Sequence, residues 1–227
     1  MITLTINQNQ IEYVGLLEKP AFRLIGEARQ IIEGLYNAFS PYQAALTDFR
    51  FEEVATTPSS FGVNVYLKSL GIYKFRFDRV EWKVSGFVDE DLPNLVAILK
   101  RGEDWLRSAA PGISFRSHTF YYAGHCQLSE STSQDFLLGL PGKEVIDIGQ
   151  SLGDGIVHNW RDSETGGRFQ LLIDHSLSVK DGVFIQLMAQ FEEDRLDYSE
   201  IILRGRALLD EALKKIGLQL EAEQEVE

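Results

Sequence analysis

Two stretches of the chain repeat the same order of hydrophobic and polar positions, the first over residues 63–115 and the second over residues 169–220. In each, segments of alternating apolar residues, typical of half-buried strands, lead to an acidic stretch and then to a pattern typical of an amphipathic helix. The helical patterns align, with Ile98-Leu99-Lys100-Arg101-Gly102 over Ile201-Ile202-Leu203-Arg204-Gly205. This repeat indicates an internal duplication and predicts two lobes related by a pseudo-two-fold axis.

The elements around the repeat follow from the same patterns. Alternation predicts a strand over residues 11–17, and Pro20 followed by helical spacing predicts a helix that ends before Ser40-Pro41. Further strands are expected at 49–54, 61–70, 72–77 and 80–87, then a helix over 89–110. The second half predicts a strand at 113–128, a short helix after 129–133, strands at 156–160, 169–177 and 183–191, and a helix over 198–216. Each half thus consists of a strand, a helix, three or more strands and a helix.

Short turns such as Lys180-Asp181-Gly182 leave no room for a crossover helix, so neighbouring strands must be mainly antiparallel. The chain is therefore expected to belong to the α+β class, with helices on one face of each sheet. We expect a first lobe over 1–112 and a second over 113–220, tightly joined because Pro111-Gly112 leads directly into a strand. Residues 221–227 are acidic with little to bury, which predicts a disordered tail.

Charge is unevenly distributed over a chain whose formal net charge is −12. Residues 1–112 hold 12 Lys and Arg against 14 Asp and Glu, whereas residues 113–227 hold 10 against 20. An acidic field repels phosphate backbones, so direct nonspecific nucleic-acid binding is not expected. The excess acidity serves either solubility or attraction of a basic protein partner. The N-terminus lacks a leader pattern and no apolar run is long enough to span a membrane, so we expect a cytoplasmic protein without membrane contact.

The sequence offers little catalytic chemistry. Cys126 is the only cysteine, which excludes an intrachain disulfide. His125 precedes it, but adjacent residues of a strand point to opposite faces, so the thiol and the imidazole are not expected to meet. The four histidines show no short ligand spacing. We therefore expect no catalytic residues, no cofactor and no metal, and a protein that is not an enzyme.

Three basic residues, Lys68, Lys74 and Arg76, have the same parity on the hairpin around Gly71 and are expected to form a basic ridge. Such a ridge either binds an acidic partner or protects a sheet edge from aggregation, as lysine often does. Tyr121 belongs to an aromatic series that either lines a surface between the lobes or fills the core.

His158, Trp160 and Arg161 place polar and aromatic groups next to a loop, which indicates either a binding surface or a turn anchored by tryptophan. Together with Lys68, Lys74, Arg76 and Tyr121, these three residues are the candidate ligand- or partner-binding residues.

The duplicated halves resemble a sporadically distributed, uncharacterised bacterial family. The resemblance rests on Glu18-Lys19-Pro20 before the first helix, on the strand through Val80-Glu81-Trp82, and on residues 171–191 with the helix that follows. The order of strands and helices is also similar to the effector-binding modules of bacterial regulators and, more distantly, to sheet-and-helix export chaperones. The resemblance implies a bacterial protein, whereas the preference for binding over catalysis rests on the missing catalytic constellation, the acidic second half and the duplication.

Two functional hypotheses follow. The first is a non-enzymatic protein-binding module of the bacterial cytoplasm, for example an antitoxin, immunity or defence-associated subunit, which uses a groove between the lobes or a sheet edge. The alternative is a small-molecule sensor with an effector bound between the lobes.

Overall fold

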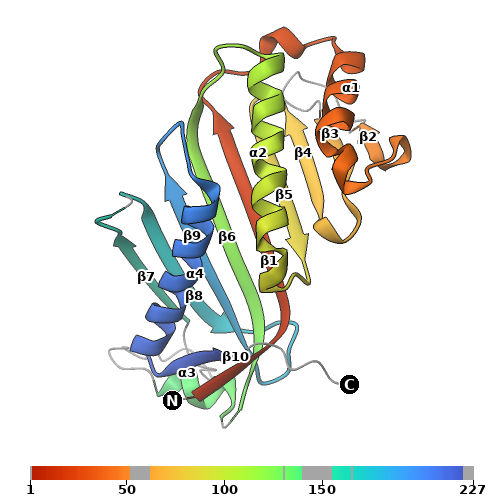
Figure 1. Cartoon of the computed structure of the whole chain (residues 1–227). Helices are drawn as coiled ribbons and strands as arrows, with labels where there is room; N and C mark the ends of the chain where they lie inside the picture. The colour runs from red at the N-terminus through yellow and green to blue at the C-terminus, as the bar shows by residue number, and fades with distance from the viewer. Residues whose placement is uncertain (1, 52–61, 130, 140–154, 165, 222–227) are drawn as a thin grey trace, which may run out of the picture. The chain divides into compact units, whose positions relative to one another are not determined.

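The computed structural model describes the whole chain except residues 1, 52–61, 130, 140–154, 165 and 222–227. The described residues form four α-helices and a sheet whose strands are mostly antiparallel (Figure 1). The α+β class and the mainly antiparallel pairing predicted from the short turns are therefore confirmed.

The chain folds into two compact units, each assembled from separate stretches of sequence. Unit 1 comprises Met1–Gln10, Tyr121–Ala189 and Arg204–Glu227, and unit 2 comprises Ile11–Phe120 and Gln190–Leu203. Strands β1 (Ile2–Leu17), β6 (Phe115–Leu128) and β9 (Val183–Phe191) and helix α4 (Tyr198–Lys215) contribute residues to both units. The division into tightly joined lobes over 1–112 and 113–220 stays a prediction.

The sheet of unit 2 contains, in hydrogen-bonded order, β2, β3, β4, β5, β1 and β6. Its remaining strands are β2 (Phe49–Phe51), β3 (Gly62–Tyr66), β4 (Ile72–Arg76) and β5 (Arg79–Ser85). The helices are α1 (Ala28–Phe39) and α2 (Leu92–Ala109), and Figure 1 shows α2 lying along one face of β4 and β5. Short 3₁₀ turns occur at Phe22–Leu24, Ser40–Tyr42, Leu46–Asp48, Lys68–Leu70 and Asp89–Asp91.

The core of unit 2 lies between these helices and one face of the sheet. Alternate strand residues are buried there, among them Tyr73 and Phe75 of β4 and Trp82 of β5. The indole N–H of Trp82 donates a hydrogen bond to the carbonyl of Leu70 at 3.0 Å, so its one polar atom is satisfied. The other face of the same strands carries mainly charged residues.

The sheet of unit 1 contains β1, β6, β9, β8 and β7 in that order, with β10 (Leu218–Glu221) parallel to β1. Strands β7 (Ile156–Arg161) and β8 (Arg168–His175) pair antiparallel. The helices are α3 (Ser133–Leu138) and α4, and α4 covers one face of these strands (Figure 1). Its core contains alternate residues of β8 and β9 and the inner side of α4, namely Phe169, Leu171, Ile173, Ile185, Leu187, Leu209 and Leu213.

Two element boundaries differ from the prediction at the N-terminal end. The first strand begins at Ile2 rather than at residue 11. The first helix begins at Ala28 rather than at Pro20, after a 3₁₀ turn over Phe22–Leu24. Gly26 has a φ of 86°, a left-handed conformation that an α-helix does not contain, so the helical pattern before it cannot join α1.

A further strand was not predicted at the C-terminal end. Gly217, with a φ of 82°, ends the helical region, as glycine commonly does. The chain then enters β10, which pairs Leu218 with Ile2. The acidic tail predicted over 221–227 lies outside the described residues beyond Glu221.

Candidate functional site

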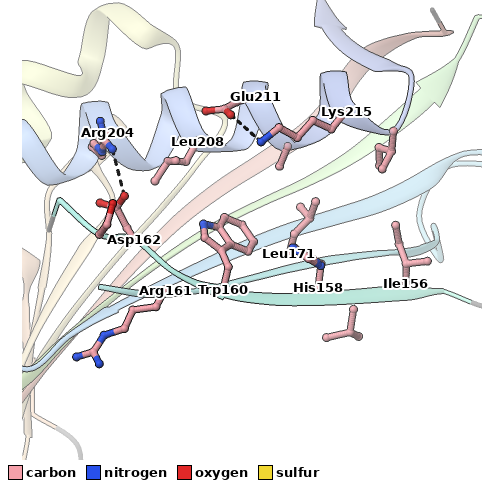
Figure 2. A pocket seen from close by; sticks show the side chains of 14 residues that line it. Ile156, His158, Trp160, Arg161, Asp162, Leu171, Arg204, Leu208, Glu211 and Lys215 are labelled. Atoms are coloured by element: carbon pink, nitrogen blue, oxygen red, sulfur yellow. Dashed lines mark hydrogen bonds and ion pairs between the residues drawn. The ribbon is translucent and has the colours of Figure 1, made fainter. Parts of the chain in front are cut away.

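A pocket of about 700 Å³ opens in unit 1 between helix α4 and strands β7 and β8 (Figure 2). We call it the α4 pocket. Its apolar surface includes Trp160, Leu171 and Leu208, and its charged groups include Asp162 and Arg204. Small-molecule sites usually occupy roughly 300–1,000 Å³ and combine apolar walls with a few fixed polar groups. The α4 pocket has the size and the composition of such a site.

The floor of the pocket is an aromatic surface on β7 and β8. Trp160 pairs with Phe169 and His158 pairs with Leu171 across the two strands. The indole ring of Trp160 stacks on the buried Phe169 ring, with ring centroids 5.5 Å apart, and on the His158 ring at 5.4 Å. Because Phe169 is fixed in the core, this stack holds the indole ring in one orientation.

The opposite wall is one flank of α4 and the turn that follows it. Its members, four residues apart and therefore on the same side of the helix, are Arg204, Leu208, Ala212 and Ile216. All four are half-buried. The neighbouring residues Leu209 and Leu213 are buried against the sheet. The pocket therefore lies beside the buried stripe of the helix.

One end of the pocket is closed by an ionic cluster. Arg204 Nη2 donates to Asp162 Oδ1 at 3.1 Å, and Arg204 Nη1 lies 2.7 Å from Glu164 Oε2. Asp162 is only 7% exposed, and a buried carboxylate needs such a partner. The hydrogen bond to Asp162 raises the pKa of the Arg204 guanidinium above its ordinary value. Backbone hydrogen bonds between Asp162 and the glycines 166 and 167 hold the carboxylate in place.

The rim along the helix carries a second ion pair. Lys215 Nζ lies 2.8 Å from Glu211 Oε1, one helical turn away, and both side chains are exposed. This hydrogen bond lowers the pKa of Glu211. Figure 2 shows the Arg161 side chain directed away from α4, and its Nε donates to the carbonyl of Gly166 at 3.2 Å. The guanidinium of Arg161 is therefore not directed at α4.

Three of the residues proposed from the sequence meet in the α4 pocket, namely His158, Trp160 and Arg161. Tyr121 also belongs to unit 1 and is half-buried on β6, but it is not among the pocket residues. The polar and aromatic group next to the loop is thus part of a concave surface, because β7 lies beneath α4.

The three residues of the basic ridge lie in unit 2. Lys68 is in the 3₁₀ turn before β4, where its Nζ donates to Gln43 Oε1 at 2.8 Å. Lys74 and Arg76 lie on β4, where both approach the carboxylate of Glu81. Lys68 therefore has a separate local partner, whereas Lys74 and Arg76 share one.

Sequence reasoning missed the helical half of the α4 pocket. Arg204 and Leu208 had been assigned to the helix, but nothing marked them as facing a pocket rather than the core or solvent. A usable signal was present: four residues at a spacing of four form a mixed charged and apolar stripe directly beside the leucine stripe. That stripe becomes a wall only because β7 lies opposite it, which the sequence does not show.

The cysteine and the histidine beside it do not form a reactive pair. Cys126 is 1% exposed, and burial raises the pKa of its thiol to about 12. His125 Nδ1 shares a hydrogen bond of 2.8 Å with Ser176 Oγ, and its ring packs against Phe184. Within the described ranges, no three His, Cys, Asp or Glu side chains are grouped closely enough to hold a metal ion.

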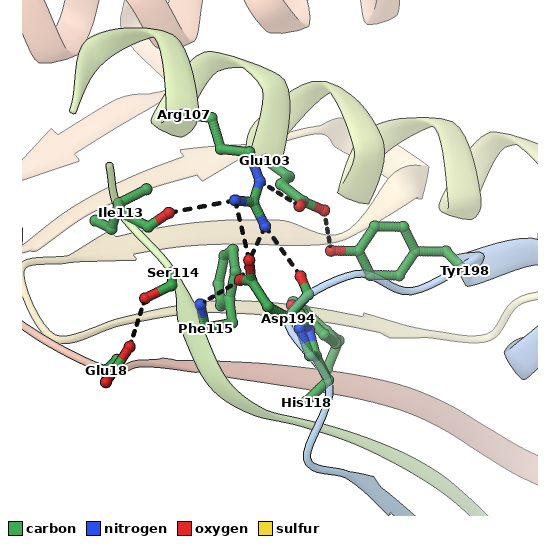
Figure 3. A network of polar contacts seen from close by, with 10 residues as sticks. Glu18, Glu103, Arg107, Ile113, Ser114, Phe115, His118, Asp194 and Tyr198 are labelled. Atoms are coloured by element: carbon green, nitrogen blue, oxygen red, sulfur yellow. Dashed lines mark hydrogen bonds and ion pairs between the residues drawn. The ribbon is translucent and has the colours of Figure 1, made fainter. Parts of the chain in front are cut away.

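A second polar cluster lies in unit 2 and ties α2 to the segment before α4 (Figure 3). Arg107 donates to the carboxylate of Asp194 at 3.0 Å and to its carbonyl at 2.9 Å. Glu103, one turn earlier on α2, accepts from Arg107 at 2.6 Å and from the Tyr198 hydroxyl at 2.5 Å. Asp194 also accepts the backbone N–H of Phe115 at 2.6 Å. These groups bind one another, which is typical of a structural clasp.

His118 lies beside this clasp and is fully buried. Its Nδ1 shares a hydrogen bond of 2.8 Å with the hydroxyl of Tyr13. Burial lowers the pKa of His118 to about 4, because a positively charged imidazolium in the core would have no water around it. The ring is therefore neutral near pH 7 and packs as part of the aromatic core with Phe115.

No protein-family model matches the chain, and neither a curated protein nor a solved structure shows a significant match. The helices in the described part are all too short or too polar to cross a membrane. The function must therefore be argued from the α4 pocket and the surfaces of the two units themselves.

Proposed function

We propose that this chain is a non-enzymatic bacterial binding module of the cytoplasm, and that the α4 pocket is its ligand site. The observation that carries the proposal is the combination of a fixed aromatic floor with ionic groups at the rim of one cavity. A surface turn anchored by tryptophan would not need a concave wall of half-buried helix residues opposite the indole.

We also propose that the module arose by internal duplication with a pseudo-two-fold relation between its halves. Helices α2 and α4 each contain 18 residues. The aligned glycines Gly102 and Gly205 both face a tyrosine of the sheet, Tyr73 in unit 2 and Tyr122 in unit 1. If both halves derive from one ancestral unit with a helix packed on a sheet, both copies would be expected to keep this contact between a helix glycine and a sheet tyrosine.

The pocket favours a small organic molecule with an apolar body and a hydrogen-bond acceptor. Trp160, Leu171 and Leu208 offer the apolar contact. At the ionic end, the buried Nε of Arg204 has no hydrogen-bond partner among the described residues. An acceptor on the ligand would satisfy this donor, which otherwise costs free energy.

Filling the pocket with a larger side chain tests the proposal. Ala212 lines the pocket and Ala207 is exposed on the same helix, so Ala212→Trp and Ala207→Trp are matched variants. The probe is the anionic aromatic dye anilinonaphthalene sulfonate, whose binding is followed by its fluorescence. We expect Ala212→Trp to weaken binding about tenfold or more and Ala207→Trp to leave it unchanged, because only the first occupies the cavity.

The same variants can be used to identify a natural ligand of the α4 pocket. Protein from the native host would be denatured, and the small molecules released would be identified by mass spectrometry. A metabolite retained by the unmodified chain and by Ala207→Trp, but lost from Ala212→Trp, supports the proposal. Equal dye binding by all three proteins contradicts it.

A protein-binding role is the second candidate, as an antitoxin, immunity or defence-associated subunit. Strand β7, which lines the α4 pocket, is the last strand in the order of unit 1, and a terminal strand can accept a strand from a partner. Affinity purification at mild salt tests this role. A stoichiometric protein retained equally by Ala212→Trp and Ala207→Trp would favour a partner that binds outside the pocket.

A further inference from the structure

A second concave surface lies in unit 2, between helices α1 and α2, which pack against each other (Figure 1). Its volume is about 560 Å³, and we call it the α1–α2 groove. One face of α1 contributes Gln30, Gly34 and Asn37, and α2 contributes Trp105, Ser108 and Ala109. The groove therefore combines one large aromatic side chain with several polar ones.

The indole of Trp105 lies against the backbone of α1. A Cβ atom at Gly34 would lie 2.5 Å from Cδ1 of this ring and closer still to Nε1, so only glycine leaves room for the indole. Glycine in the interior of a helix destabilises it, and the contact with Trp105 gives a reason for glycine at this position of α1. The ring also packs edge to face on Phe75, with centroids 5.1 Å apart. These two contacts fix the orientation of the indole at the groove.

The indole N–H of Trp105 has no hydrogen-bond acceptor among the described residues. The indole N–H of Trp82, by contrast, donates to a backbone carbonyl at 3.0 Å. Trp105 is half-buried, and a tryptophan N–H in such a position usually has a partner. The side chains of Gln30, Asn37 and Ser108 also make no hydrogen bond to another described residue. A ligand in the groove would therefore meet donors and acceptors that the described part of the chain does not use.

The same flank of the aligned helix lines a cavity in unit 1. If the sequence alignment of α2 with α4 is continued, Trp105 lies over Leu208 and Ala109 over Ala212. Leu208 and Ala212 line the α4 pocket, as Trp105 and Ala109 line the α1–α2 groove. Leu208 adds an apolar wall, whereas Trp105 adds a hydrogen-bond donor, so the two cavities should bind different ligands. The inference below does not require the α4 pocket to bind anything.

We propose that the α1–α2 groove binds an uncharged saccharide. The C–H face of a sugar ring is apolar and packs on an indole ring, while each hydroxyl both donates and accepts hydrogen bonds. The amides of Gln30 and Asn37 donate from nitrogen and accept at oxygen, which suits neighbouring hydroxyls of one sugar. A sugar oxygen would also accept the indole N–H of Trp105.

The charged residues of the groove disfavour ionic ligands. Arg29 Nε lies 3.9 Å from Glu33 Oε2, and Glu27 adds a second carboxylate to the lining. An anion would be repelled by these carboxylates. An organic cation would be attracted to them, but it offers no acceptor to the indole and amide N–H groups, which would lose water without a replacement. A saccharide provides donors and acceptors without a charge.

Binding of the full chain to a glycan array tests the inference. The chain is biotinylated and assembled on labelled streptavidin, because multivalent display raises the avidity of a weak site. We expect binding to uncharged oligosaccharides that weakens about fivefold or more in Asn37→Ala, which loses one hydrogen-bonding side chain. Asn94→Ala is the matched control, because Asn94 is an exposed asparagine of α2 outside the groove, and it should leave binding unchanged.

Tryptophan fluorescence then identifies the site. The oligosaccharide bound best on the array is titrated into Trp105→Phe and Trp160→Phe. We expect the change in emission to persist in Trp160→Phe, which alters only the α4 pocket. It should be lost in Trp105→Phe, which keeps an aromatic ring beside Phe75 but has no indole.

Four results would overturn the inference. The first is that no uncharged saccharide on the array binds, and the second is equal loss of binding in Asn37→Ala and Asn94→Ala. The third is a change in emission that persists in Trp105→Phe and is lost in Trp160→Phe. The fourth is a response to tetramethylammonium chloride, lost in Trp105→Phe, without a response to any saccharide, which would assign the groove to an organic cation. If Trp105→Phe does not fold, the two asparagine variants decide the outcome.

Discussion

Replacing Gly102 by alanine tests how closely helix α2 packs on the sheet of unit 2. A Cβ atom at this position would lie 2.6 Å from Cε2 and from the hydroxyl oxygen of Tyr73. Carbon atoms in contact are normally about 3.5–4.0 Å apart, so the helix and the ring would have to separate by about 1 Å. Tyr73 is 1% exposed and its ring packs against Phe39 at 4.9 Å, so the ring has no free space to enter.

Two effects of opposite sign determine the result. Alanine in place of glycine in a helix interior stabilises by about 1 kcal/mol. Forcing an extra methyl group into a packed core costs about 1–3 kcal/mol, and a rigid aromatic neighbour places this site at the upper end. We therefore expect Gly102→Ala to reduce the free energy of unfolding by about 1–2 kcal/mol.

Gly205→Ala is the matched control because Gly205 occupies the aligned position of α4. Its Cβ would lie 3.3 Å from Tyr122 Cε2, and the next atoms are 3.9 and 4.0 Å away. A shift of a few tenths of an ångström relieves this contact, so the helix preference should prevail and stabilise by up to about 1 kcal/mol.

Urea unfolding followed by circular dichroism measures both variants. The midpoint should fall for Gly102→Ala and should stay or rise for Gly205→Ala. The reasoning is refuted if Gly102→Ala is as stable as the unmodified chain, or if both variants lose the same free energy.

Two further predictions concern the clasp and the thiol. Partial burial opposes ionisation of Asp194, but the Phe115 N–H and Arg107 hold the pKa of its carboxyl below the ordinary value. The carboxylate of Asp194 therefore contributes to stability above about pH 4, and this contribution is lost as the pH falls. Asp194→Asn should lower the free energy of unfolding by about 1 kcal/mol at pH 7 and by less at pH 3, as measured by urea titration. An equal loss at both pH values would contradict this. Because burial raises the pKa of Cys126 to about 12, the native thiol should react with Ellman's reagent at least about a hundredfold more slowly than in urea, and a rate equal to that of the unfolded chain would show that it is accessible.

Short patterns of neighbouring residues were enough to predict many of the strands and helices. Alternation of apolar residues located β5 and β9, and helical spacing located α2 and α4, because strands and helices bury residues with different periods. Short turns implied antiparallel pairing. The first helix was predicted too early because Gly26 interrupts the pattern with a backbone conformation that spacing alone does not show.

The candidate site shows the same division. Sequence drew attention to His158 and Trp160 through their residue types, and to the cations of the hairpin through their shared parity. Only the tertiary structure places Arg204 and Leu208 opposite Trp160, since they are separated along the chain and meet through the packing of α4 on β7 and β8. The clasp is a similar case, because Arg107 and Asp194 are 87 residues apart.

The class of fold and most of the strands and helices could therefore be predicted from the amino-acid sequence alone, together with the chemistry available at each position. Only the packing of the whole chain shows which of these positions form a cavity, and it places Lys74 on an inner strand rather than an edge. The physical reason is range: periodicity and turn preferences act over a few residues, whereas strand order and helix docking are set by the burial of apolar surface across the whole unit.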